Sequence, residues 1–194
     1  MKVITAIEDY VVKPDDIKVF MAGGITKCRD WQKEMIDILN QYSLPEVFDN
    51  VVLFNPRREN FPIHDPNASL DQIKWEFNWI EKCDFFLMHF CNSESVQPIC
   101  MYELGRNLVR MQQKFPNDYY HRIMICIESG YSREQDVIIQ TRLAFNSISN
   151  DILKTGKKDY TFDLVHKINS FFFTPIMKRS DVSKLIDEVI GNNA

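Results

Sequence analysis

The sequence predicts an α/β domain of three layers, in which helices cover both faces of a doubly wound parallel sheet. Short runs of apolar residues alternate along the chain with amphipathic stretches of helical periodicity. Strands that are apolar on both faces need cover on both faces, and the intervening helices supply it. A length of 194 residues suits one domain with a full hydrophobic core. We therefore expect a single domain over residues 1–194.

The individual elements follow from periodicity and turn signals. Strands are predicted from short apolar runs at 17–22, 51–54, 85–90 and 122–127. Helices are predicted from apolar residues three and four positions apart at 29–42, 69–83, 98–114 and 133–148. Ser69 is a good N-cap for the second helix, and Gln72 completes a capping box. The loop between the second strand and this helix contains prolines and is long for a simple connection, which favours a functional loop.

The pattern of the C-terminal segment, residues 150–194, predicts helices but does not indicate a role for the segment. A helix is expected at 162–169, and a last helix at 181–190. Between them lies the apolar run Phe171 to Thr174, which reads either as an exposed contact surface or as a buried edge strand.

Composition and charge are those of an ordinary globular protein, with 45% hydrophobic and 26% charged residues. The net charge of -4 disfavours a nucleic-acid polymer as partner, because such proteins usually present a basic face. No apolar run approaches the roughly 20 residues that span a bilayer, so we expect no membrane association. Acidic residues at Glu8 and Asp9 do not suit a signal peptide, and we expect a cytoplasmic protein.

The cysteines and histidines predict neither disulfides nor a metal site. The five cysteines form no Cys-x-x-Cys pair, and reduced cysteines pack as small hydrophobic residues in a reducing compartment. His89 and Cys91 make the one close histidine–cysteine pair, whereas a zinc site needs three or four ligands. We therefore expect no metal and no cofactor.

Glu103 is the most informative residue of the sequence, because it places a carboxylate in a largely apolar helical stretch. Either it performs chemistry, or it forms an ion pair with Arg106 three residues later, which Arg110 could extend. Gly105 lies in the middle of the same predicted helix, where glycine costs about 1 kcal/mol relative to alanine. That cost predicts a close approach of another group to the backbone at Gly105.

A second acid, Glu76, lies on the helix before the third strand. If both helices deliver their acids to one edge of the sheet, the two carboxylates would have pKa values driven apart, which yields one acid and one base. The alternative is a surface position for Glu76, with Trp75 and Trp79 in the core.

Ligands of doubly wound sheets bind beyond the carboxyl ends of the strands, near the switch in strand order. That rule selects the loops that begin at Gly23, Asn55, Cys91 and Glu128. Gly23-Gly24 allows close approach of a ligand or forms a bare strand-to-helix turn. Arg57 and Arg58 hold a phosphate or carboxylate, or form a solvated pair.

Several blocks of sequence, taken in their order and spacing, resemble the nucleoside 2-deoxyribosyltransferase family, in particular its less characterised branch. The blocks are Val19-Phe20-Met21-Ala22-Gly23-Gly24-Ile25, Asp30-Trp31-Gln32, Asn55-Pro56-Arg57-Arg58, Gln72-Ile73-Lys74-Trp75-Glu76, Tyr102-Glu103-Leu104-Gly105, Asp136-Val137 and Gln140-Thr141. No block is specific alone, but the ordered set is. The resemblance covers about residues 17–145.

The resemblance implies a flavodoxin-like fold and a double displacement in which Glu103 attacks C1′ of the sugar. Glu76 matches an acid that handles the proton of the base. Asp136 matches a side chain supplied by a neighbouring subunit, which implies a homo-oligomer, a dimer or larger. The substrates would be a small nucleoside or nucleotide and a free base. The expected substrate-binding residues are Gly23, Gly24, Asp30, Trp31, Asn55, Arg57, Asp136 and Gln140.

Two departures from the family pattern concern the substrate. Phe20 stands where characterised transferases tend to have a tyrosine that orients the nucleophile, and Gln97 stands near the position where they carry a second acid that contacts the base. The resemblance as a whole implies a nucleoside deoxyribosyltransferase, with two alternatives. One is an N-glycoside hydrolase of nucleosides or 5′-monophosphates, and the other is a nucleotide-binding module without catalysis.

Overall fold

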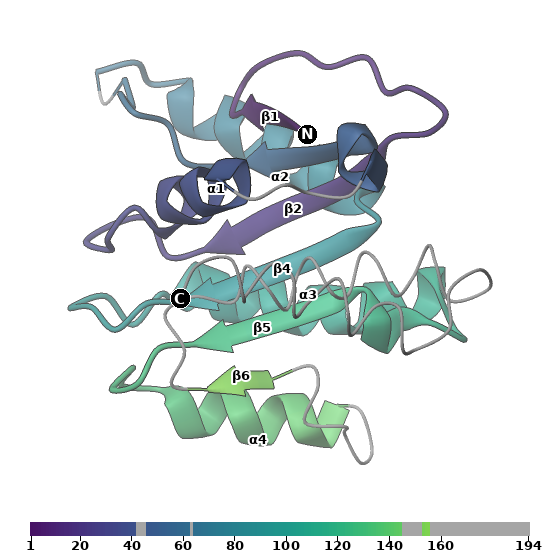
Figure 1. Ribbon diagram of the computed structural model, residues 1–194. Coiled ribbons are helices and arrows are strands. Elements are labelled where there is room, and N and C mark those ends of the chain that lie inside the picture. The colour runs from purple at the N-terminus through teal and green to yellow at the C-terminus, as the bar shows by residue number, and fades with distance from the viewer. Residues whose placement is uncertain (42–45, 63, 145–152, 156–194) are drawn as a thin grey trace.

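A parallel sheet with strand order β1-β3-β2-β4-β5-β6 forms the centre of the computed structural model (Figure 1). The structure describes residues 1–41, 46–62, 64–144 and 153–155. Its strands are β1 (Lys2–Thr5), β2 (Ile17–Gly23), β3 (Val51–Asn55), β4 (Phe85–Phe90), β5 (Ile123–Ile127) and β6 (Leu153–Thr155). Its helices are α1 (Trp31–Gln41), α2 (Ala68–Lys82), α3 (Pro98–Lys114) and α4 (Glu134–Ala144), with 3₁₀-helices at Glu46–Asn50 and Tyr119–His121.

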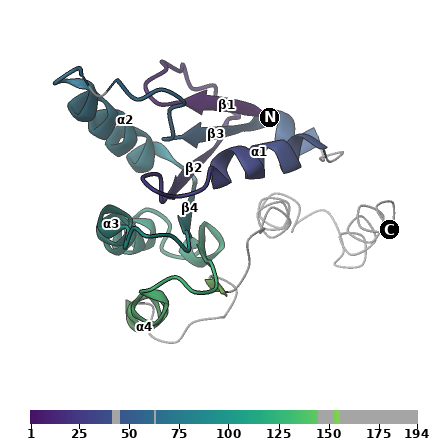
Figure 2. The same cartoon turned by 90° about the vertical axis from the view of Figure 1, so that its left-hand side faces the viewer.

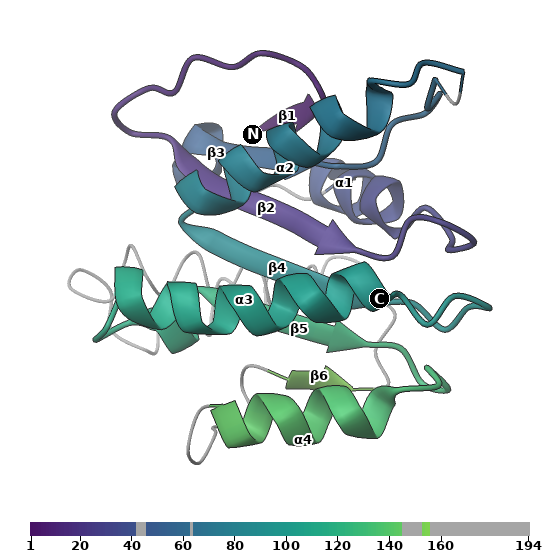
Figure 3. The same cartoon turned by 180° about the vertical axis from the view of Figure 1, so that it is seen from behind.

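The predicted α/β architecture is confirmed. All the strand pairs are parallel, and the order β3-β2-β4-β5-β6 is the flavodoxin-like order, to which β1 is added at one edge. Helix α1 covers one face, whereas α2, α3 and α4 cover the other (Figures 2 and 3). The direction of winding reverses at β2, which lies between β3 and β4. The carboxyl ends of β2 and β4 therefore flank the switch point.

The alternation of side chains along each strand builds a separate core on each face. In β2, Phe20 and Ala22 pack with Trp79 and Leu104 on the side of α2 and α3. Val19 and Met21, on the opposite face, pack with residues of α1 such as Trp31. The strands are apolar in succession because both of their faces are covered. Among the described residues, no helix is long and apolar enough to cross a membrane.

One strand was missed, and two local predictions were wrong. Strand β1 was not predicted, because it is a short edge strand that is only partly buried and pairs with β3 alone. Helix α2 begins at Ala68, so Ser69 is not its N-cap, and Asn67 at the cap position makes no capping hydrogen bond. Gln72 does not complete a capping box, because its side chain turns to the pocket side of the helix.

Most of the predictions for the C-terminal segment fall outside the residues that the structure describes. Helix α4 ends at Ala144 within the described residues, and the short strand β6 was not predicted. The predicted helices at 162–169 and 181–190 and the apolar run Phe171 to Thr174 lie outside the described residues.

Candidate active site

A cavity of about 350 Å³ opens at the switch point of the sheet. The end of β2 and its glycine loop form one side, and the beginning of α3 with the preceding loop forms another. Pro56, after β3, and Glu76, on α2, complete the lining. This volume lies within the range of small-molecule sites, which is about 300–1,000 Å³.

The cavity brings together the two acids that the sequence selected. Glu76 comes from α2 and Glu103 from α3, and both half-buried side chains line the cavity. Burial, and then the negative charge of Glu76, raise the pKa of Glu103 to about 7. Burial also raises the pKa of Glu76, although a hydrogen bond from Gln72 opposes the shift. Burial thus favours the protonated form of both acids, as in sites where a carboxyl group donates a proton to a substrate.

Helix α3 does not use Glu103 in the ion pair that the spacing suggested. Arg106 points instead to Glu81 of α2, with 3.6 Å between Nη2 and Oε1, and its guanidinium lies over the ring of Phe77. Among the described residues, no hydrogen bond or ion pair reaches the Glu103 carboxylate. The interpretation of Gly105 was also wrong, because this residue is exposed and a Cβ there would meet no atom within 4 Å.

Gln72 fixes the second acid against the loop after β3. Its Nε2 donates to Glu76 Oε1 and to the carbonyl oxygen of Pro56, both at 2.9 Å. The two bonds tie the carboxylate on α2 to the loop that follows β3, so the carboxylate faces the cavity in one orientation.

The glycine loop after β2 lies close against its neighbours. A Cβ at Gly23 would lie 2.5 Å from the carbonyl oxygen of His89, so only glycine fits beside β4. The carbonyl oxygen of Gly24 accepts a hydrogen bond of 3.1 Å from Trp31 Nε1. Trp31 is fully buried and stacks on His89 with 4.6 Å between ring centroids. Gly23 and Gly24 line the cavity, whereas Trp31 supports the loop from behind.

Arg57 holds this loop together. Its Nη2 donates to the carbonyl oxygen of Arg29 at 2.8 Å and also reaches those of Gly24, Ile25 and Cys28. Its Nε contacts Gln32 Oε1 on α1 at 3.0 Å and Oδ1 of Asp30, the residue before α1, at 3.3 Å. These contacts favour a supporting role for Arg57 over direct contact with a phosphate.

Asn55 and Asp30 take part in the same support. Asn55 Oδ1 accepts the backbone N–H of Arg57 at 2.9 Å. Asp30 Oδ1 accepts the backbone N–H of Lys33 at 3.0 Å in the first turn of α1. Neither Asn55 nor Asp30 is among the residues that line the cavity.

Asp136 and Gln140 lie on α4 and do not line the cavity of their own chain. Asp136 forms an ion pair of 2.8 Å with Arg133, and Gln140 is exposed. A role of either residue in a neighbouring subunit stays a prediction.

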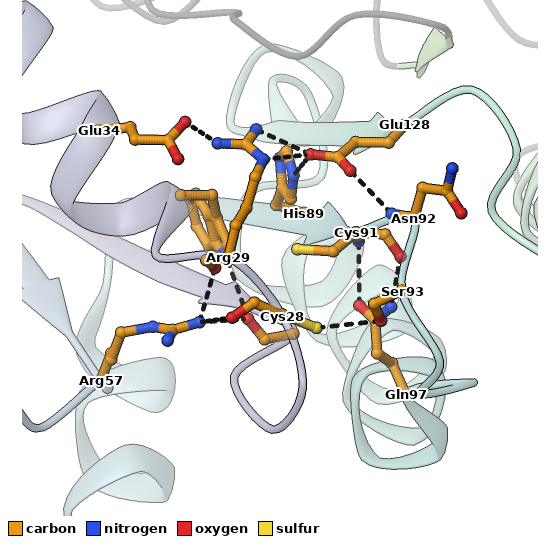
Figure 4. Close-up of polar contacts among 12 residues, drawn as sticks. Cys28, Arg29, Glu34, Arg57, His89, Cys91, Asn92, Ser93, Gln97 and Glu128 are labelled. Atoms are coloured by element: carbon orange, nitrogen blue, oxygen red, sulfur yellow. Dashed lines mark hydrogen bonds and ion pairs between the residues drawn. The ribbon is translucent and has the colours of Figure 1, made fainter.

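The sequence did not predict the buried ion-pair network that lies beside the cavity. It pointed only to the loop that begins at Glu128, because this loop follows a predicted strand. Glu128 Oε1 accepts from Arg29 Nε at 2.8 Å and lies 3.0 Å from His89 Nε2, and its Oε2 accepts the backbone N–H of Asn92 at 2.8 Å (Figure 4). Arg29 also pairs with Glu34. The network joins the loops that follow β2, β4 and β5.

The charges of this network follow from its contacts. Burial alone would raise the pKa of Glu128, but the hydrogen bonds from His89, Asn92 and Arg29 outweigh it and lower that pKa to about 2. Burial lowers the pKa of His89, although the bond with Glu128 opposes the shift, so the imidazole is neutral and its Nε2–H donates.

His89, Cys91 and Glu128 place one possible ligand atom each within 4.8 Å of one another. Two features disfavour a cation there. The Arg29 guanidinium already neutralises Glu128 at 2.7 Å, and burial raises the pKa of the Cys91 thiol, so it carries no charge. The group fits an internal ion-pair network better than a metal site.

Fold and cavity together define an α/β protein whose candidate active site presents two carboxylates at the switch point of a parallel sheet. The chain belongs to the nucleoside 2-deoxyribosyltransferase-like family, whose family model matches residues 16–115. The resemblance is thereby confirmed, and membership suggests a glycosyltransferase-like enzyme that acts on small nucleosides. The matched segment includes Glu76 and Glu103 and ends before α4. A search among curated proteins finds no significant match.

Proposed function

We propose that the protein cleaves the N-glycosidic bond of a (deoxy)nucleoside through a covalent intermediate on Glu103 and transfers the sugar to a second base. The observation that carries this proposal is the pair of half-buried carboxylates, Glu76 and Glu103, in one cavity. A pKa of about 7 leaves a substantial fraction of Glu103 ionised at neutral pH, as a nucleophile requires.

Glu103 and Glu76 supply the nucleophile and the proton donor that the two displacements require. A Glu103 carboxylate oxygen forms a bond to C1′ while the bond from C1′ to the base nitrogen breaks, and the base leaves with the electron pair. Glu76, protonated at that stage, gives its proton to the leaving base. Attack of a second base on C1′ then releases Glu103, and the proton of this base returns to Glu76. Two displacements through oxocarbenium-like transition states retain the configuration at C1′.

Hydrolysis is the second candidate, and it differs only in that water attacks the intermediate. Phe20 lines the cavity and offers no hydroxyl group, and the side-chain amide of Gln97 is bonded to main-chain atoms. The family pattern suggested polar contacts at both positions. Within the described lining, Phe20 is therefore less polar than expected, and the amide of Gln97 is already used by the main chain. That observation favours a weakly held acceptor base and a larger share of hydrolysis.

The deciding experiment is incubation with 2′-deoxynucleosides and their 5′-monophosphates, with and without a second free base, followed by chromatography. A new nucleoside that forms only with the second base supports transfer. Release of base and free sugar without an acceptor supports hydrolysis. Absence of both reactions with every substrate, while the protein still binds nucleotides, would replace the proposal by a binding module.

The covalent step has its own expected result. Incubation with a 2-fluoro-2-deoxy nucleoside should add one sugar-sized increment to the intact mass, because fluorine at C2 disfavours the oxocarbenium-like transition states and slows release of the ester. The adduct should lie on the peptide that contains Glu103. The Glu103→Gln variant serves as the control and should show no increment. Active protein that never acquires the increment would contradict a covalent intermediate.

We further propose a symmetric oligomer whose interface includes the outer faces of α3 and α4. Apolar side chains on these helices are at least half exposed, and they are Ile99, Tyr102, Val109, Ile139 and Leu143. Exposed apolar side chains on two helices that contact each other favour an interface between proteins. Asp136 lies on the same helix as two of these residues.

Charged substitutions test this interface. The double variant Val109→Glu with Ile139→Glu should be a monomer by light scattering at micromolar concentration, whereas the unmodified protein should be a dimer or larger. Val11→Glu is the matched control, because Val11 is 86% exposed in the loop after β1. A monomeric unmodified protein would exclude the proposed oligomer.

A further inference from the structure

Gln97 occupies an unusual position at the beginning of α3. It is the N-cap residue, it is 4% exposed, and its backbone lies in the left-handed region with φ of 50° and ψ of 54°. A residue other than glycine adopts this conformation at a cost, so the surrounding contacts must hold it there. Its side chain turns back towards the end of β4 (Figure 4).

The amide of Gln97 clamps the main chain at Cys91, the residue after β4. Its Oε1 accepts the N–H of Cys91 at 3.1 Å, and its Nε2 donates to the carbonyl oxygen of Cys91 at 2.7 Å. Nε2 also donates to the carbonyl oxygen of Ser95 at 3.3 Å. Both groups of the amide are thus used by the loop between β4 and α3.

The same amide packs against the glycine loop on the opposite side of the cavity. A Cβ at Gly24 would overlap Gln97 Oε1 and lie 2.8 Å from its Cδ. Gln97 therefore contacts two of the segments that form the cavity, the loop after β2 and the loop after β4. Both Gly24 and Gln97 also line the cavity.

The contacts of Gln97 also affect the position of Glu103, which lies on the same helix. The carbonyl oxygen of Gln97 accepts the N–H of Met101 at 3.2 Å, so Gln97 closes the first turn of α3. Glu103 follows in the second turn of the same helix. The side-chain bonds to Cys91 thus tie this end of α3 to β4, and the glycine loop limits its movement towards β2.

We propose that Gln97 is a positioning residue, which sets the start of α3 and thereby holds Glu103 in the cavity, rather than a residue that contacts the base. The proposal rests on the proposed function only where it concerns catalysis. Placement of α3 by the Gln97 amide is a structural property that is measured independently of any reaction.

The test compares Gln97→Glu with the matched control Gln113→Glu, which makes the same change at an exposed position of α3. A carboxylate at 97 cannot donate to the carbonyl oxygens of Cys91 and Ser95 and repels them. We expect kcat to fall about 10- to 100-fold, as for a displaced catalytic group, with KM changed much less. Gln113→Glu should leave both constants unchanged.

Hydrogen exchange by mass spectrometry supplies the second readout. Amides in peptides from Cys91 to Glu103 should exchange faster in Gln97→Glu, and the remaining peptides should not change. Gln97→Gly is the second variant, because it removes the side chain but suits the left-handed backbone, and it therefore covers the case in which Gln97→Glu fails to fold. It should show the same local increase in exchange.

Each outcome decides the proposal. Normal exchange and a normal kcat in Gln97→Gly would overturn it. A change in base preference at unchanged exchange in Gln97→Glu would also overturn it, in favour of direct contact with the base. If the unmodified protein acts on no nucleoside, the proposed function fails, whereas faster local exchange in the variants would still establish the positioning role.

Discussion

Replacing Glu103 by glutamine is expected to reduce turnover of any nucleoside substrate by roughly three orders of magnitude or more, because the proposed nucleophile is removed. The substitution keeps the shape of the side chain. KM should change little, since substrate contacts elsewhere in the cavity remain. Chromatographic measurement of released base provides the rates, and Glu59→Gln, at an exposed position, is the control for loss of one carboxylate.

Stability separates this functional role from a structural one. The folded protein raises the pKa of Glu103 to about 7, so folding disfavours its charged form. A raised pKa contributes stability below the ordinary pKa of a glutamate, and this contribution is lost as the pH rises through about 7. At pH 8 the Glu103→Gln variant should therefore unfold at the same temperature as the unmodified protein or higher. An inactive variant that is also clearly less stable would point to a structural role.

The same pKa sets the pH dependence of the reaction. The proposed reaction needs Glu103 ionised and Glu76 protonated, so kcat/KM should rise with pH as Glu103 ionises near pH 7 and fall again at higher pH, where Glu76 loses its proton. The groups that act on this carboxylate are Glu76 on α2, which raises its pKa, and Arg106 on α3, which lowers it. Glu76→Gln should move the acid limb to lower pH while reducing kcat, because it removes a nearby negative charge and a proton donor.

Replacing Glu128 by glutamine is expected to destabilise the fold by about 3 kcal/mol, since it leaves the charge of Arg29 without its buried partner. The new amide nitrogen would also face a donor, either Arg29 and His89 on one side or the Asn92 N–H on the other. The measurement is the free energy of unfolding in urea at pH 7.

The pH dependence of this effect has a definite sign. Folding lowers the pKa of Glu128 from about 4.5 to about 2. Its stabilising contribution is complete above the higher value and disappears as the pH falls through the lower one. The difference between Glu128→Gln and the unmodified protein should therefore shrink between pH 5 and pH 2. Glu94→Gln is the control, because Glu94 pairs with Lys27 at the surface, where an ion pair contributes little. Equal effects of both substitutions would contradict the network.

The sequence predicted the fold better than the site. Buried strands such as Phe85–Phe90 are continuous apolar runs, and periodicity alone identifies them. Strand β1 lacks that signal, because only one neighbour and a partial cover stabilise it. Helix N-caps were also poorly predicted, since Gln72 is drawn into contacts with Pro56 and Glu76 that depend on the tertiary structure.

Within the site, residue types were easier to select than partners. The sequence singled out Glu76 and Glu103, but their presence in one cavity depends on the packing of α2 beside α3. Spacing suggested Arg106 as the partner of Glu103, whereas the folded chain offers Arg106 the more distant Glu81. Arg57 looked like a ligand for an anion, yet four carbonyl oxygens of the preceding loop surround it. Contacts between residues far apart in the sequence leave no local pattern.

The contacts of Arg57 have a consequence for the entropy of binding. A glycine-containing loop would ordinarily sample many conformations and lose them when a ligand binds, which weakens affinity. Here a single guanidinium joins the carbonyl oxygens of Gly24, Ile25, Cys28 and Arg29. The loop is thus preorganised, so contacts that a ligand in the cavity made with it would go into affinity rather than into ordering the chain.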